Sequence, residues 1–376
     1  MKRNFIGMCL TVAMLMIIVF AIPNVSADGI YRQKITDPVL TESDLTASGS
    51  PYVEITVNET KTIATAAAYG DDLSGQILII AQYDKDGILA SANIARASEY
   101  DKTKISVNIN ITTTQNIRAF LWIESDLTPV CRSVVYAPSI FLAGDQTMMS
   151  WASDYYPQQG WGEPFSEKFD PGVSVYNNAV AGYTAEDFYK NIWPAVKADI
   201  AADDYFIVGF LHNDFYKTRY SDSDPRYDAN YFSTYKEYMT KFITECKAMG
   251  VNIVLIVPPN RGENVNFHIN CETGQNFSAV IPALAKEYDV PCINIHEWTL
   301  GLLQSDLNGT KKKMYLYKLI EQGIITEDQL AKHPNTNLKI NGDDLTDLSE
   351  TGASEIADYV AEQIKTKVPE LASYLK

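Results

Sequence analysis

After Pro138, short apolar runs alternate with segments of helical periodicity, and this alternation constrains the fold more than any other feature of the 376-residue chain. The apolar runs have the length and composition of buried strands, and the segments between them have the spacing and capping residues of amphipathic helices. The predicted strands are Ile140–Ala143, Val173–Tyr176, Tyr205–Leu211, Ile253–Val257 and Cys292–Ile295. The predicted helices are Thr184–Ile200, Tyr231–Met249, Phe277–Tyr288 and Ser349–Lys367. Such alternation predicts a three-layer α/β/α domain with a parallel sheet over residues 138–376.

The segment before Pro138 has a different pattern, that of short strands separated by turns. In Lys104–Ile111 every second residue is apolar and β-branched while the others are polar, which is typical of a half-buried strand. Further strands are predicted at Gln76–Tyr83, Ile88–Ala95 and Ala119–Ile123, with a hairpin turn at Asp84–Gly87. We therefore expect a small antiparallel β-sandwich domain over residues 28–137.

Residues 1–27 have the organisation of a secretory signal peptide. Lys2 and Arg3 precede a long apolar stretch, and the small residues Ser26 and Ala27 follow at a position typical of signal-peptidase cleavage. The alternative is an uncleaved membrane anchor, because the apolar stretch is long for a signal peptide. Either interpretation places the folded part outside the cytosol, secreted or at the bacterial cell surface.

Composition and charge narrow the class of protein. Hydrophobic residues make up 46% and charged residues 21%, which is ordinary for a folded soluble protein. Loss of Lys2 and Arg3 with the signal peptide lowers the basic count from 31 to 29 against 47 acidic residues, so the net charge changes from −16 to −18. Such a surface repels phosphate backbones, so nucleic acid is excluded as a partner, and no membrane association is expected after cleavage.

The cysteines carry no recognisable metal or redox motif. Four remain after removal of the signal peptide, and their spacings fit neither a zinc site nor a redox pair; they are Cys131, Cys246, Cys271 and Cys292. Buried thiols or one disulfide both remain open. No cofactor is predicted.

Ligands of parallel α/β sheets bind at the carboxyl ends of the strands. The loops that begin at Gly144, Asn177, Leu211 and Pro258 are therefore the places to search for a site.

Those loops, together with a segment before the last predicted helix, carry a series of blocks in a recognisable order. The blocks are Phe141–Thr147, Asn177–Gly182, Phe210–Asp214 and Asp344–Ala353, and Pro157, Gly160, Trp161 and Gly162 accompany the first. The series resembles that of the SGNH (GDSL-type) hydrolases, and the residues around Trp161 resemble their rhamnogalacturonan acetylesterase branch. The resemblance covers Ile140 to about Lys367 and implies a flavodoxin-like fold.

The resemblance also implies roles for single residues in acyl transfer through a serine nucleophile. Gly182 and Asn213 match the oxyanion-hole donors, and Asp344 matches the carboxylate of the catalytic triad. The nucleophile position holds Gln146, whose amide cannot attack an ester, and the histidine position holds Asp347. Both substitutions affect the chemistry itself, whereas the oxyanion positions are retained.

Two further interpretations of these loops remain open. Thr147 or Ser150 would be the nearest substitutes for the missing nucleophile, although neither is expected to point into the site. The carboxylates of Asp343, Asp344 and Asp347 either are solvated, or bind calcium, or share a proton. A water molecule activated by Asp347 would permit slow hydrolysis.

Aromatic residues of the first loop suit a sugar-binding surface. Trp151, Tyr155, Tyr156 and Trp161 offer flat apolar faces with polar edges, and His212 of the third block is a further candidate ligand-binding residue. The competing interpretation is that these rings pack against the first helix.

The leading prediction is a catalytically inactive pseudo-esterase that recognises cell-wall or plant polysaccharide, with acetylated pectin or xylan as candidate partners. One alternative is an active carbohydrate O-acetylesterase with unusual catalytic residues. The other is a structural or adaptor protein of the cell surface.

Overall fold

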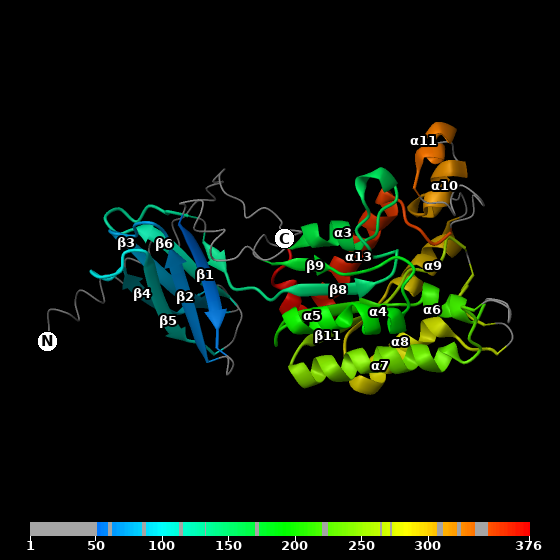
Figure 1. Cartoon of the computed structure of the whole chain (residues 1–376), viewed down its shortest axis with the longest axis horizontal. Helices are drawn as coiled ribbons and strands as arrows, with labels where there is room; N and C mark the ends of the chain where they lie inside the picture. Colours follow the sequence, from blue (N-terminus) through cyan, green and yellow to red (C-terminus); the bar gives the residue numbers. More distant parts are fainter. Residues whose placement is uncertain are drawn as a thin grey trace. The chain divides into compact units, whose positions relative to one another are not determined.

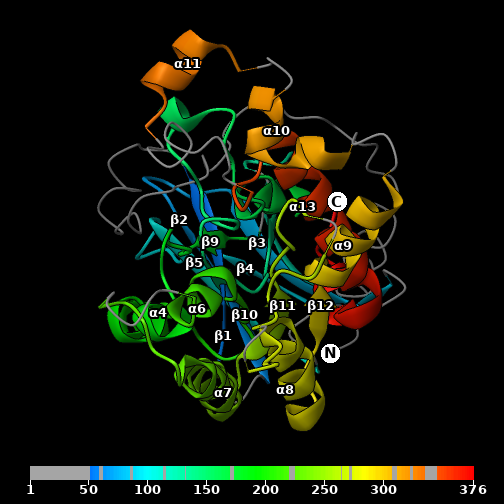
Figure 2. The same cartoon turned by 90° about the vertical axis from the view of Figure 1, so that its right-hand side faces the viewer.

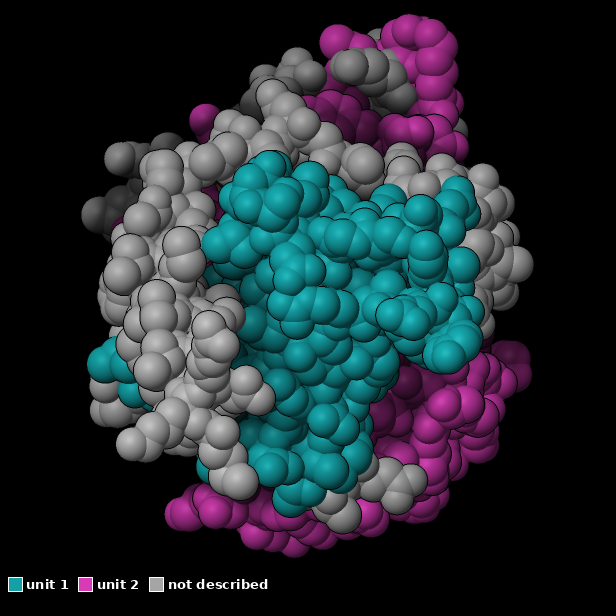
Figure 3. Space-filling model, turned by 90° about the vertical axis from the view of Figure 1, so that its left-hand side faces the viewer, with its two compact units in different colours: residues 1–137 teal, residues 138–376 magenta. Residues whose placement is uncertain are grey.

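The computed structural model describes residues 51–376 except 59–61, 85–87, 113–115, 132, 170–172, 220–224, 264, 271–272, 307–310, 322–324 and 335–344. The predicted signal peptide, most of the Asp84–Gly87 turn, Asp343 and Asp344 lie outside the described residues. The chain divides into two compact units, Met1–Ala137 and Pro138–Lys376 (Figures 1 and 3).

The first unit is a sandwich of two antiparallel sheets. One sheet has the strand order β1-β2-β5 and the other β4-β3-β6-β7, and all neighbouring strands in both sheets are antiparallel. The strands are β1 (Tyr52–Val57), β2 (Ile63–Tyr69), β3 (Gln76–Tyr83), β4 (Leu89–Arg96), β5 (Lys104–Asn110), β6 (Ile117–Ile123) and β7 (Val134–Val135).

The alternating pattern of β5 decides which side chains form the core of the sandwich. Ile105, Val107 and Ile109 are buried and the residues between them are exposed, as the sequence pattern predicts. They pack in one cluster with Leu78 and Leu121 of the opposite sheet. The second face of that opposite sheet carries a smaller apolar cluster around Trp122.

The second unit contains a five-stranded parallel sheet. The strands are β8 (Ile140–Gly144), β9 (Val175–Asn177), β10 (Tyr205–Gly209), β11 (Asn252–Val257) and β12 (Cys292–Asn294). Their order is β12-β11-β10-β8-β9, and every pairing is parallel. This is the flavodoxin-like order, so the predicted fold class is confirmed.

Helices cover both faces of this sheet (Figures 1 and 2). One face packs against α4 (Ala185–Asn191), α5 (Trp193–Asp199), α7 (Tyr231–Met249) and α8 (Val280–Tyr288) in a single apolar cluster. On the other face, α13 (Glu350–Lys367) contacts α3 (Gly162–Phe165) and α9 (Ile295–Ser305). The remaining short helices are η1 (Ser153–Tyr155), η2 (Ser166–Lys168), α6 (His212–Lys217), η3 (Phe277–Ala279), η4 (Lys311–Met314), α10 (Leu316–Glu321), α11 (Glu327–Lys332) and α14 (Pro369–Ala372).

The predicted single helix Thr184–Ile200 is wrong in one respect, since it is broken at Ile192 into α4 and α5. Pro194 lacks the N–H that would continue the hydrogen-bonding of α4, and it occupies the first turn of α5, where that N–H is not needed. The start of α4 is as predicted: Thr184 and Asp187 form a reciprocal capping box.

Topology brings the loops after β8 and β10 together. These strands are neighbours, paired from Ile140–Tyr205 to Gly144–Gly209, and the chain leaves them toward opposite sides of the sheet. Such a switch point opens a crevice at the carboxyl edge. Among the described residues, no helix combines the length and the apolar character that crossing a membrane requires.

Candidate functional site

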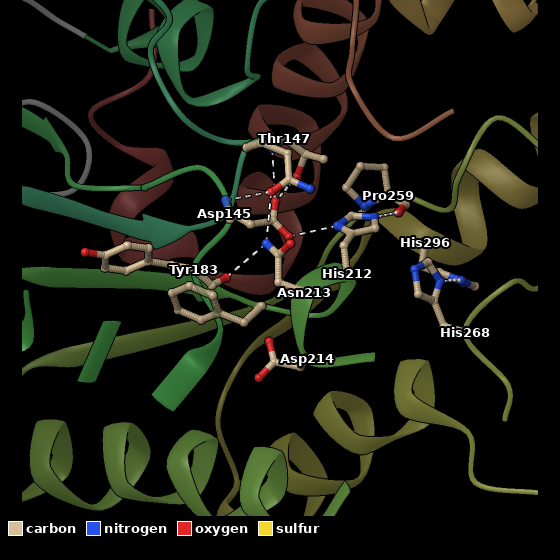
Figure 4. A network of polar contacts seen from close by, with 12 residues as sticks. Asp145, Thr147, Tyr183, His212, Asn213, Asp214, Pro259, His268 and His296 are labelled. Atoms are coloured by element: carbon tan, nitrogen blue, oxygen red, sulfur yellow. Dashed lines mark hydrogen bonds and ion pairs between the residues drawn. The ribbon is translucent and has the colours of Figure 1, made fainter. Parts of the chain in front are cut away.

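A buried ion pair joins the loop after β8 to the loop after β10. His212 Nδ1 lies 2.8 Å from Asp145 Oδ2, and both side chains are 1% exposed (Figure 4). The other carboxylate oxygen accepts hydrogen bonds from the backbone N–H and the hydroxyl of Thr147, at 3.0 and 2.8 Å. The pair therefore fixes the two loops relative to each other.

The partners of His212 decide the protonation of the pair. Its Nε2 lies 3.0 Å from the carbonyl oxygen of Pro259, which can only accept, so Nε2 carries a proton. Burial raises the pKa of Asp145, but the charge of His212 and the hydrogen bonds from His212 and Thr147 outweigh it and hold that pKa below its ordinary value. An ionised Asp145 requires a second proton on Nδ1, so the pair is carboxylate and imidazolium.

Gln146, the residue next to Asp145, directs its side-chain carbonyl toward two hydrogen-bond donors. Oε1 accepts from Asn213 Nδ2 at 2.9 Å and from the backbone N–H of Gly182 at 3.3 Å. Gly182 has φ of +79°, a left-handed conformation that glycine adopts without strain. Asn213 Nδ2 also donates to the carbonyl of Tyr183 at 3.1 Å (Figure 4), which orients the amide. The two predicted oxyanion-hole donors thus converge on one point, and the oxygen of Gln146 occupies it.

Asp347 is buried, with 5% of its surface exposed. Its Oδ2 accepts a hydrogen bond of 2.8 Å from Nε2 of Gln158, which is also buried. An isolated bridge between Gln158 and Ser349 holds the two segments side by side. Sequence reasoning did not identify Gln158, because nothing in its local pattern indicates a partner 189 residues away.

The two hydroxyls nearest to Gln146 are both engaged. The Thr147 hydroxyl donates to Asp145, and Ser150 Oγ accepts a 3.0 Å hydrogen bond from Asn177 Nδ2. Neither hydroxyl has a histidine among its hydrogen-bond partners.

No family model matches the chain. Over 228 aligned residues the chain is 30% identical to rhamnogalacturonan acetylesterase RhgT of Bacillus subtilis (strain 168). The aligned region covers 60% of this chain and 89% of RhgT. The chain belongs to the rhamnogalacturonan acetylesterase family of SGNH hydrolases. It is also 27% identical over 230 residues to the probable rhamnogalacturonan acetylesterase YesY of the same organism, covering 61% of this chain and 93% of that protein.

Solved structures also resemble the chain. The YxiM protein of Bacillus subtilis has a TM-score of 0.46 and 15% identity, covering 85% of this chain and 91% of that one. The acetylxylan esterase Axe2 of Geobacillus stearothermophilus has a TM-score of 0.42 and 14% identity, covering 61% and 94%.

In this acetylesterase-family chain, the structure separates the aromatic candidates into surface and interior residues. Tyr156 is 66% exposed and its hydroxyl donates to Glu350, while Trp151 and Tyr155 are partly exposed and pack ring to ring with centroids 4.7 Å apart. Trp161 has no exposed surface and packs against Phe165. The prediction that Trp161 offers a sugar-binding surface is therefore wrong, because its ring is part of the core.

His212 also differs from the prediction. It is 1% exposed and both ring nitrogens are engaged within the protein, so it positions the two loops and has no free atom for a ligand. Its role in the buried pair was not anticipated. The only available signal was that Asp145 and His212 both follow adjacent strands in motif blocks.

Three further buried side chains lie close to this network (Figure 4). The carboxyl of Asp214 accepts hydrogen bonds from the N–H of Ala185, and burial raises its pKa well above the ordinary value. His268 Nδ1 lies 3.3 Å from His296 Nε2, and burial lowers the pKa of both histidines, to about 4 for His296. Both histidines are therefore neutral near pH 7.

Within the described part of the chain, no group of three or more His, Cys, Asp or Glu side chains is arranged to bind a metal ion. Asp343 and Asp344 of the calcium hypothesis lie outside that part, as does Cys271. Cys131, Cys246 and Cys292 are free thiols.

Proposed function

We propose that this chain is a secreted, non-catalytic relative of the carbohydrate acetylesterases that binds polysaccharide at the site around Gln146. The names of its relatives, rhamnogalacturonan acetylesterases, point to acetylated plant polysaccharide such as pectin as the ligand class. An acetylxylan esterase among the similar structures makes xylan the second ligand to test. Secretion is supported by the signal-like residues 1–27.

The observation that carries the proposal is the position of Gln146 Oε1, which accepts hydrogen bonds from both Gly182 and Asn213. An esterase needs those two donors for the oxyanion that develops on the ester carbonyl. Here they are already satisfied by an uncharged oxygen of the protein. An ester carbonyl can enter this position only if the Gln146 side chain leaves.

The chemistry of the neighbouring groups also supports a non-catalytic site. An amide nitrogen is delocalised and does not attack an ester, and a carboxylate such as Asp347 is a weak base toward a hydroxyl because its ordinary pKa is near 4. In the described residues the nearby hydroxyls of Thr147 and Ser150 have other partners.

The same arrangement leaves groups for binding. No described residue accepts a hydrogen bond from Gln146 Nε2, so this donor is available to a sugar hydroxyl. Trp151, Tyr155 and Tyr156 add partly or largely exposed aromatic rings from the same loop. Because the acetyl carbonyl has no free oxyanion hole to enter, binding should not depend on acetylation.

The test combines a hydrolysis assay with calorimetric binding to acetylated and deacetylated pectic and xylan oligosaccharides. We expect no acetate release above a heat-treated control, and equal affinity for the acetylated and deacetylated forms. Gln146→Ala should change the affinity, and Gln363→Ala, an amide on α13, should not. Turnover that disappears in Gln146→Ala would establish an active esterase instead, and absence of binding to every oligosaccharide would favour an adaptor role.

A further inference from the structure

Two arginine side chains stack around one aromatic ring beside the candidate site. The guanidinium carbons of Arg261 and Arg219 lie 4.1 and 5.5 Å from the ring centroid of Phe267. Arg261 also lies over Tyr216 at 5.8 Å, and Arg219 over Phe215 at 5.5 Å. Both guanidinium carbons lie within 5.5 Å of the same ring centroid, so two positive charges flank one aromatic ring.

No anionic partner of either guanidinium is found in the part of the chain that the structure describes. Among the described residues, no ion pair includes Arg219 or Arg261. Nε of Arg261 is buried and has no hydrogen-bond partner, although buried donors in folded proteins are almost always paired. In a chain with 47 acidic and 31 basic residues, two adjacent arginines that pair with no described carboxylate are unexpected. Stacking on a ring uses the face of a guanidinium and leaves its N–H edge for an anion.

The arginines are close to the oxyanion-hole position. Tyr216, which Arg261 covers, lies three residues after Asn213 on α6, so the two side chains share one helix face about one turn apart. The backbone N–H of Gly262 donates to the carbonyl of Leu345 at 2.8 Å, which joins the Arg261 loop to the last motif block. The pair therefore belongs to the same carboxyl edge of the sheet as Gln146.

A buried asparagine side chain fixes the loop that carries Arg261. Asn260 is completely buried, and its Nδ2 lies within 3.0 Å of three carbonyl oxygens of the loop, those of Arg261, Glu263 and Val265. A loop fixed in this way presents its arginine without a large ordering cost on binding.

We propose that Arg219 and Arg261 form an anion subsite that binds the carboxylate of an acidic sugar in the polysaccharide. The subsite extends the proposed function, since it places a charged sugar unit next to the unit that contacts Gln146. A carboxylate accepts two parallel N–H bonds from the edge of a guanidinium, which a neutral sugar cannot do. The free Nε of Arg261 is the donor that such a ligand would satisfy.

The experiment compares trigalacturonate with its fully methyl-esterified form, in which each carboxylate is a neutral methyl ester, by calorimetry with the full chain. We expect tighter binding of the acid, by about tenfold or more, and a loss of this difference in Arg261→Gln and Arg219→Gln. Arg118→Gln is the matched control, because this substitution removes the same charge from another arginine that is stacked on an aromatic ring. The guanidinium carbon of Arg118 lies 5.9 Å from the ring centroid of Tyr83 in the β-sandwich. Added salt should weaken binding of the acid and leave that of the ester unchanged.

The outcomes separate the subsite from the proposed function. Equal binding of acid and ester, or an acid preference that survives both arginine substitutions, would overturn the subsite while glycan binding dependent on Gln146 would stand. Loss of ester and acid binding together in Arg219→Gln, with an unchanged melting temperature, would also overturn it, since the arginine would then act on the sugar ring and not on the charge. Binding of neither ligand in the unsubstituted protein overturns the subsite, and a parallel titration with acetylated xylo-oligosaccharide then tests the proposed function on its own.

Discussion

Asp145→Ala removes the acceptor of three buried hydrogen bonds at once, those from His212 and from the backbone and hydroxyl of Thr147. It leaves a buried imidazolium without its counter-ion and two further donors without an acceptor. Asp145→Asn is the informative comparison, because the amide has nearly the same shape and can keep most of these contacts.

The expected magnitudes follow from this count. Removing one partner of a buried ion pair costs about 3–5 kcal/mol of unfolding free energy. In Asp145→Asn the amide oxygen still accepts from Thr147, and the amide nitrogen donates to Nδ1 of a now neutral His212. One amide hydrogen remains buried and unpaired, which costs about 1–2 kcal/mol. Asparagine should therefore be less harmful than alanine by about 2 kcal/mol.

Urea and thermal unfolding, each followed by tryptophan fluorescence, are suitable assays, because four of the five tryptophans lie in the α/β unit. For a unit of this size the alanine variant should melt about 10 °C below the parent protein, and the asparagine variant about 5 °C below it. Asp199→Ala, an exposed carboxylate at the end of α5, is the control and should stay within about 0.5 kcal/mol.

Equal losses in the alanine and asparagine variants would refute the reasoning, because the effect would then come from the charge and not from the number of unpaired donors. A loss of unfolding free energy below about 1 kcal/mol in Asp145→Ala would also refute the reasoning, because the buried Asp145–His212 pair would then contribute little to stability.

Three further predictions concern other parts of the α/β unit. Gln146→Ser combined with Asp347→His should produce weak esterase activity toward an activated acetate ester, and neither change alone should, because nucleophile and base are needed together; a folded double variant that a phosphonate does not label would contradict the assigned positions. Stability should fall by about 2 kcal/mol between pH 7 and pH 5 on account of His296, since the unfolded chain takes up a proton near pH 6.5 while the buried ring resists it down to about pH 4; denaturant titrations of His296→Asn should lose that part of the pH dependence. Gly352→Ala should lower the melting temperature measured by circular dichroism, because the added Cβ would lie 2.1 Å from the carbonyl oxygen of Met314 and this overlap outweighs a gain in helix propensity of about 1 kcal/mol; a higher melting temperature would show that the backbone yields.

Local pattern was sufficient for most of the secondary structure. The alternation in Lys104–Asn110 correctly gives the buried face of β5, and the apolar spacing of α7 gives its limits, Tyr231–Met249. These features depend on neighbours within one or two turns of the chain. The break at Ile192 was missed because the apolar spacing continues across it, although Pro194 was a signal for it.

The sequence by itself determined the order of the motif blocks, the retained Gly182 and Asn213, and the amide at Gln146. Only the tertiary structure decided where that amide points, because its partners are 36 and 67 residues away and meet it through the pairing of β8 with β9 and with β10. The same holds for side chains that fit a binding surface and a core equally well. Trp161 is interior and Tyr156 is exposed, although they are five residues apart, since burial depends on which distant segments pack over a ring. The unpaired Nε of Arg261 could not be foreseen either, because whether a described donor finds an acceptor depends on the whole fold and not on a local pattern.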